Sequence, residues 1–132
     1  MEGQTFLDIN LEDAVEPKTV PEDEYLVKVN NVRMDEDKNN NPYVLLSLEI
    51  PDVPESKGFT HFIGFPHAED NAKQKNQRKW SMKVMFDAFK FDYRNQPLEN
   101  IIGAETWALV GEGDDDPEYG KQNYIRRWLG QR

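Results

Sequence analysis

The chain has 132 residues, of which 37% are hydrophobic and 11% aromatic, enough for one domain with its own core. It carries a net charge of −9 and no cysteine, which excludes a disulfide framework, a thiolate metal site and a cysteine nucleophile. No basic leader precedes an apolar run, and no apolar stretch reaches the roughly eighteen residues of a membrane span, so we expect a cytoplasmic protein without a membrane partner.

The negative charge is unevenly distributed. Residues 1–24 hold eight acids against Lys18 alone, a net charge of −7, while the other 108 residues hold 17 acids and 15 bases, a net charge of −2. An acidic protein repels nucleic acid, but the nearly neutral remainder leaves room for a local basic groove. We therefore divide the chain into an acidic N-terminal arm, residues 1–24, and one domain, residues 25–132.

The arm is interpreted as an extended solubilising segment with an edge strand near residues 5–11. The alternative is an acidic lure for partner proteins, or a DNA mimic that acts within the molecule.

Three strands are expected to open the domain. Residues 25–34 alternate as a strand, residues 35–42 (D-E-D-K-N-N-N-P) form a turn, and residues 43–50 form a second strand. The third strand, residues 58–65, places Phe59 and His61 on one face and Phe62 on the other. The alternation does not decide which face of this strand points into the core.

A helix follows the third strand. Acidic and capping residues at 69–71 predict its start, and apolar residues from Trp80 to Phe89 recur every three to four positions. A helical turn at residues 97–102, a strand at 106–110, an acidic loop at 111–117 and a last strand at 119–128 complete the chain. This order predicts a mainly β OB-fold, a five-stranded, partly open barrel with its helix between strands three and four.

The last predicted strand, Y-G-K-Q-N-Y-I-R-R-W, combines aromatic and basic residues. Strict alternation places Ile125 and Arg127 on one face, and Tyr124, Arg126 and Trp128 on the other. Rings stack on bases and guanidinium groups pair with phosphates, so the second face is a candidate nucleic-acid surface.

Signatures of catalysis are weak. The sequence lacks G-x-x-x-x-G-K-[ST], H-E-x-x-H and G-x-S-x-G, and we expect neither an enzyme nor a cofactor. His61 and His67 are interpreted as surface residues rather than metal ligands. The spacing of Asp114–Asp116 matches no calcium loop, so we expect no metal site.

Signatures of binding are stronger. In an OB-fold, ligands lie on strands two and three, between the loops that join strands one to two and four to five. Each ring has a second interpretation as core filling. The candidate contact residues are aromatic side chains for stacking and cations for phosphate groups: Lys28, Tyr43, Phe59, Phe62, Lys121, Tyr124, Arg126, Arg127 and Trp128.

Three segments carry a resemblance to a known family. F-L-D-I-N with the following E-Y-L-V-K-V, L-E-N-I-I-G-A-E-T-W-A-L-V, and Y-G-K-Q-N-Y-I-R-R-W are similar to the opening, the segment before strand four and the terminal strand of small phage-encoded OB-fold proteins. Members of that family bind single-stranded DNA in phage replication and recombination. Bacterial-type single-stranded DNA-binding proteins recruit partners through an acidic C-terminal tail. This chain ends G-Q-R instead, so its acidic arm is the candidate for that role.

The resemblance and the residue pattern together predict a non-catalytic, largely sequence-independent single-stranded DNA-binding protein. Other replication or recombination proteins are candidate partners through the arm. The alternative is an acidic OB-like interaction module, or a DNA mimic, that binds a host or replication protein; RNA binding is a third hypothesis.

Overall fold

The computed structural model describes residues 8–132. Its elements in chain order are β1 (Asp23–Glu36), β2 (Pro42–Glu49), β3 (Phe59–Gly64), α1 (Ala72–Phe89), the 3-10 helix η1 (Leu98–Ile101), β4 (Glu105–Glu112) and β5 (Asn123–Gly130). The predicted order of three strands, a helix and two strands is confirmed. Residues 8–11 form a bend and no strand, and residues 5–7 of the predicted edge strand lie outside the described residues.

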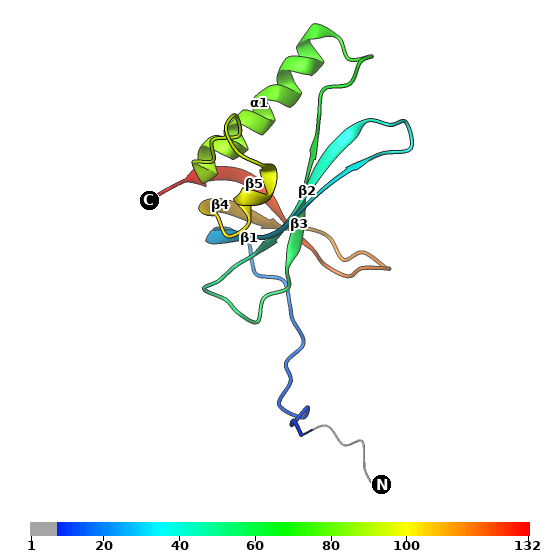
Figure 1. The fold of residues 1–132 in the computed structure, drawn as a ribbon. Coiled ribbons are helices and arrows are strands. Elements are labelled where there is room, and N and C mark those ends of the chain that lie inside the picture. Colours follow the sequence, from blue (N-terminus) through cyan, green and yellow to red (C-terminus); the bar gives the residue numbers. More distant parts are fainter. Residues whose placement is uncertain (1–7) are drawn as a thin grey trace, which may run out of the picture.

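The strands form one antiparallel sheet in the order β3-β2-β1-β4-β5. The long strand β1 pairs with β4 through its first half and with β2 through its second half. A bulge at Asn30 lets β1 bend between these two partners. The sheet thereby curls into a half-barrel (Figure 1), which is consistent with an OB-like fold.

The core lies inside the curl of the sheet. Fully buried side chains from three strands meet there, among them Val27, Leu46 and Val110. Burial of an aliphatic side chain of this size contributes about 1.5–3 kcal/mol relative to exposure. Met85 and Phe89 on the C-terminal half of α1 pack against the same cluster, so the helix is fixed by that half.

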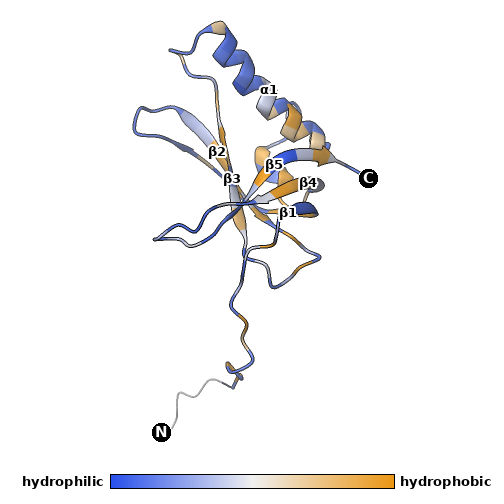
Figure 2. Cartoon of the chain, turned by 180° about the vertical axis from the view of Figure 1, so that it is seen from behind, coloured by the Kyte–Doolittle hydropathy of each residue, from blue (hydrophilic) through white to orange (hydrophobic). Residues whose placement is uncertain are grey.

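The predicted capping side chain at the start of helix α1 is that of Asn71, and it forms a capping box with Gln74. The Asn71 side chain accepts a hydrogen bond from the Gln74 backbone N–H, and the Gln74 side chain accepts one from the Asn71 N–H. The helix ends at Lys90 in the left-handed conformation. Its N-terminal half projects beyond the sheet (Figure 1) and is largely hydrophilic, whereas the C-terminal half is more hydrophobic (Figure 2).

The arm is tied to the barrel before the predicted domain boundary. Val20 is 5% exposed, and its backbone N–H and C=O both bond to the buried side chain of Asn123, at 3.0 and 2.9 Å. Lys18 forms a parallel bridge with Ser56. The boundary at residue 25 therefore falls inside β1, and residues 18–22 belong to the folded unit. None of the helices in residues 8–132 is long and apolar enough to cross a membrane.

Candidate nucleic-acid interface

An aromatic platform lies on the outer face of β2 and β3. The register places Phe62 opposite Leu45, which in turn lies opposite Arg33 of β1, so these three side chains share the outer face. Phe62 is 59% exposed, and its ring centroid lies 5.0 Å from that of Tyr43. The alternation of residues 58–65 does not decide which face of this strand is buried. The structure shows that the Phe62 face of β3 points outward and the Phe59 face inward.

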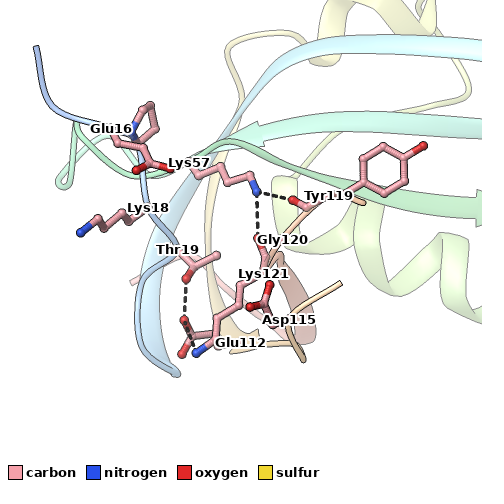
Figure 3. Close-up of a pocket in the computed structure, with 10 residues that line it drawn as sticks. Glu16, Lys18, Thr19, Lys57, Glu112, Asp115, Tyr119, Gly120 and Lys121 are labelled. Carbon is pink, nitrogen blue, oxygen red and sulfur yellow. Dashed lines mark hydrogen bonds and ion pairs between the residues drawn. The ribbon is translucent and has the colours of Figure 1, made fainter. Parts of the chain in front are cut away.

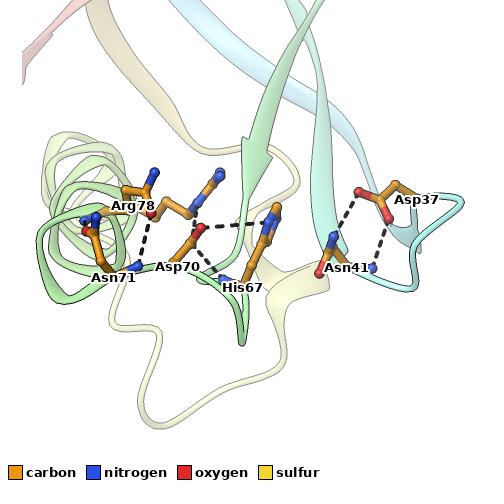
Figure 4. A network of polar contacts seen from close by, with 7 residues as sticks. Asp37, Asn41, His67, Asp70, Asn71 and Arg78 are labelled. Atoms are coloured by element: carbon orange, nitrogen blue, oxygen red, sulfur yellow. Dashed lines mark hydrogen bonds and ion pairs between the residues drawn. The ribbon is translucent and has the colours of Figure 1, made fainter.

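A guanidinium group lies beside this platform because Gly64 has no side chain. A Cβ atom on Gly64 would lie 3.0 Å from Nη1 of Arg78 and 3.6 Å from the Phe62 ring. Asp70 accepts a 2.8 Å hydrogen bond from Nε of Arg78 and another from the His67 backbone N–H (Figure 4). The His67 bond first, and then Arg78, lower the pKa of Asp70, which is therefore a carboxylate at neutral pH.

A groove of about 310 Å³ lies between β3, α1 and β5, on the His61 side of β3. The exposed ring of Trp80 and the side chains of Arg126 and Arg127 line it. Ser81 lines both this groove and the neighbouring hollow that contains Arg78, so the two hollows adjoin. Arg78 thus stands between the platform and the groove, and the rings and guanidinium groups of these surfaces are of the kinds that bind unpaired bases and phosphates.

A bulge in β5 changes the predicted faces of that strand. Val110 of β4 pairs with Ile125, and the preceding residue, Leu109, pairs with Arg127. Arg126 therefore has no partner position in β4 and is the extra residue of the bulge. Arg126 and Arg127 are consequently both exposed, and Trp128 turns inward. The prediction that Trp128 shares a face with Tyr124 is wrong. The Trp128 ring packs 5.2 Å from Phe89 and meets His61 edge-on at 5.1 Å.

Tyr124 is 43% exposed on the outer face and lies across Gly111. A Cβ atom on Gly111 would approach the Tyr124 ring to 2.5 Å, so the glycine makes this arrangement possible. Arg126 donates from Nη1 to both carboxylate oxygens of Glu22 at 2.9 Å, and this pairing raises the Arg126 pKa. Arg126, which is predicted to contact a phosphate, is therefore already paired with the Glu22 carboxylate.

Three further predicted contact residues, Phe59, Lys28 and Lys121, lie in positions that do not suit DNA binding. Phe59 is 4% exposed within the core, so its ring cannot receive a base. Lys28 pairs in register with Glu49 of β2 and Glu105 of β4, so two acidic residues are its cross-strand neighbours.

Lys121 lies in the loop between β4 and β5, with Nζ 4.0 Å from Glu112. In the same region Nζ of Lys57 donates to the backbone carbonyls of Tyr119 and Lys121, both at 2.9 Å (Figure 3). The loop is thus fastened to the segment between β2 and β3, and the pocket of about 520 Å³ beside it is lined by acids as well as lysines.

Trp80, Arg78 and Arg33 belong to this surface but are absent from the sequence-based candidates. Trp80 fits the apolar period of α1 and reads as core, but it is 62% exposed because the helix projects beyond the barrel. In the sequence, Arg78 is one of several helix cations that we interpret as solvated. Gly64 and Asp70 are the residues that place it beside the platform, and this depends on how α1 packs beside β3.

Residues 8–132 contain no group of three histidine or acidic side chains placed to hold an ion. The interpretation of His61 as a surface residue is wrong, because its imidazole packs against Trp128. His61 is half-buried, and burial lowers its pKa to about 4, so the imidazole is neutral at pH 7. A search of protein-family models and of curated proteins finds no match to this chain.

Proposed function

We propose that the chain is an OB-fold protein that binds single-stranded DNA without strong sequence preference, along the surface from Tyr43 and Phe62 to the groove between α1 and β5. It would protect exposed strands during phage DNA replication or recombination. The resemblance of its strand segments to phage single-stranded DNA-binding proteins supports this setting, and the half-barrel topology is compatible with it.

The exposed aromatic pair carries the proposal. Phe62 is 59% exposed in mid-strand and packs against the Tyr43 ring, so the two side chains form an aromatic patch on the outer face of β2 and β3. The Tyr43–Phe62 pair presents π-faces that stack with any base, at about 1–3 kcal/mol per base. Bases in a duplex are already stacked and paired, so the platform favours unpaired strands.

The cations on the proposed path offset part of the net negative charge. Four arginines lie on or beside it: Arg33, Arg78, Arg126 and Arg127. Arg78 already pairs with Asp70 and Arg126 with Glu22, so a phosphate would compete with these two carboxylates. Figure 1 shows the acidic loop between β4 and β5 and the β1–β2 hairpin projecting to the same side of the barrel, where they would flank a bound strand.

A variant series tests the proposal. Phe62→Ala should raise the Kd for oligo-dT about 5- to 150-fold, the equivalent of one lost stacking contact. Tyr93→Ser is the matched control on an oligo-dT short enough to hold one copy, because Tyr93 is also an exposed aromatic residue (47%) but lies beyond the far side of α1. Equal affinities for wild type, Phe62→Ala and the control would refute the platform. Absence of any DNA binding would instead favour the acidic interaction module.

A further inference from the structure

A second groove lies on the other side of α1 and takes no part in the proposed DNA path. It has a volume of about 240 Å³, and Met82, Phe86 and Tyr93 form its apolar surface. The Tyr93 ring stacks on Phe86 at a centroid distance of 5.3 Å, which holds one wall in place. Lys79 and Lys83 line the rim, and Nζ of Lys83 also lies 3.0 Å from Asp87, so the groove suits an apolar side chain whose flanking acid faces Lys79.

The chain itself carries a segment of that chemistry. Residues 8–16, D-I-N-L-E-D-A-V-E, contain four acids and no base. Ile9 and Leu11 are 64% and 63% exposed. A turn begins at these residues, because the Asn10 side chain accepts a 3.0 Å bond from the Glu12 N–H, and the Leu11 carbonyl accepts one from the Ala14 N–H. The segment thus presents two exposed apolar side chains beside an acidic turn.

Charge complementarity links the segment to the helix. Helix α1 contains five cations and one acid, a net charge of +4, whereas residues 8–16 carry −4. Such a pairing guides association and selects the partner face, and salt weakens it.

The arrangement of the fold favours a second molecule over the same one. Figures 1 and 2 share a vertical axis, and in both the arm leaves the barrel at the end opposite α1. The bonds between Val20 and Asn123 anchor the base of the arm at the barrel. An arm held there points away from its own groove, which leaves residues 8–16 accessible to the groove of another copy.

We propose that residues 8–16 of one copy dock in the Lys79–Met82–Lys83–Phe86–Tyr93 groove of a second copy, with Leu11, whose carbonyl closes the turn, as the apolar anchor. Each copy offers one arm and one groove, so two copies can exchange arms in a closed dimer, and unpaired ends can extend a chain of copies along a bound strand.

The test is a mixing experiment by sedimentation velocity on the full chain at concentrations up to about 1 mM. Wild type should self-associate, and salt should weaken the association. Leu11→Ser in the arm and Tyr93→Ser in the groove should each raise the dimer Kd at least tenfold. A mixture of the two variants retains one intact arm and one intact groove, so it should form heterodimers that neither variant forms alone.

Lys79→Glu is a second groove variant, at an exposed position that leaves the apolar packing intact, and it should weaken association as well. Ile102→Ser, which alters an apolar residue that is 46% exposed elsewhere, should associate like wild type. A wild type that stays monomeric, or variants that associate as wild type does, would overturn the proposal. Binding of each variant to a short oligo-dT should be unchanged, so failure here leaves the proposed DNA-binding function standing.

Discussion

The half-buried imidazole of His61 makes the stability of this fold depend on pH in a defined window. Burial between the edge of β3 and the Trp128 ring lowers the pKa of His61 to about 4, against about 6.5 for an exposed histidine. Between these values the unfolded chain binds a proton that the folded chain does not. The free energy of unfolding should therefore fall as pH decreases from 6.5 to 4, and this contribution is fully present above pH 6.5.

The size of the effect follows from the difference in pKa. About 2.5 pKa units at 1.36 kcal/mol each correspond to a loss of about 3 kcal/mol across the window. Asp37 and Asp70 have pKa values below their usual 3.8, and their contributions are lost only as pH falls below that value. The two groups of titrations should thus be separable.

Urea denaturation followed by tryptophan fluorescence, at a series of pH values from 7.5 to 4.5, measures this dependence. His61→Phe should abolish most of the slope, whereas His67→Asn, which leaves His61 in place, should keep it. A wild type with constant stability from pH 6.5 to 4.5 would refute the reasoning, as would an unchanged slope in His61→Phe.

Three further substitutions test particular contacts. Asn123→Ala removes a buried amide that satisfies three backbone groups and should lower the free energy of unfolding by about 3 kcal/mol, measured by urea denaturation; a loss below about 1 kcal/mol would mean that water replaces the amide. Gly111→Ala should displace the Tyr124 ring and weaken oligo-dT binding several-fold, with a stability change of less than about 1 kcal/mol; unchanged affinity would exclude Tyr124 from the interface. Glu22→Gln should release Arg126, tighten binding and steepen the salt dependence of log K by about 0.7 in anisotropy titrations; an unchanged slope would show that Arg126 contacts no phosphate.

The element order was predictable because it rests on local signals. Alternating apolar residues and turn residues define β1 and β2, and the Asn71 cap defines the start of α1. These signals act over a few residues, so they do not depend on how the sheet curls. The start of β5 was predicted four residues early, because Asp116 binds the N–H groups of Glu118 and Tyr119 and holds them in a turn.

The composition of the candidate site was less predictable, since it depends on long-range geometry. The bulge at Arg126 arises from the register between β4 and β5, and it moves Trp128 from the predicted face to the core. Trp80 has the sequence pattern of a core residue and is exposed only because α1 extends past the barrel. Arg78 joins the platform across Gly64, a contact between a helix and a strand that no local pattern indicates.

The central claim is that the outer surface of this half-barrel binds unpaired DNA. The most direct test titrates the protein into fluorescent oligo-dT of about thirty nucleotides, and into a duplex of equal length, at two salt concentrations. We predict tighter binding to the single strand, with affinity that falls as salt rises. Equal affinity for the duplex, or no binding at low salt, would contradict the account.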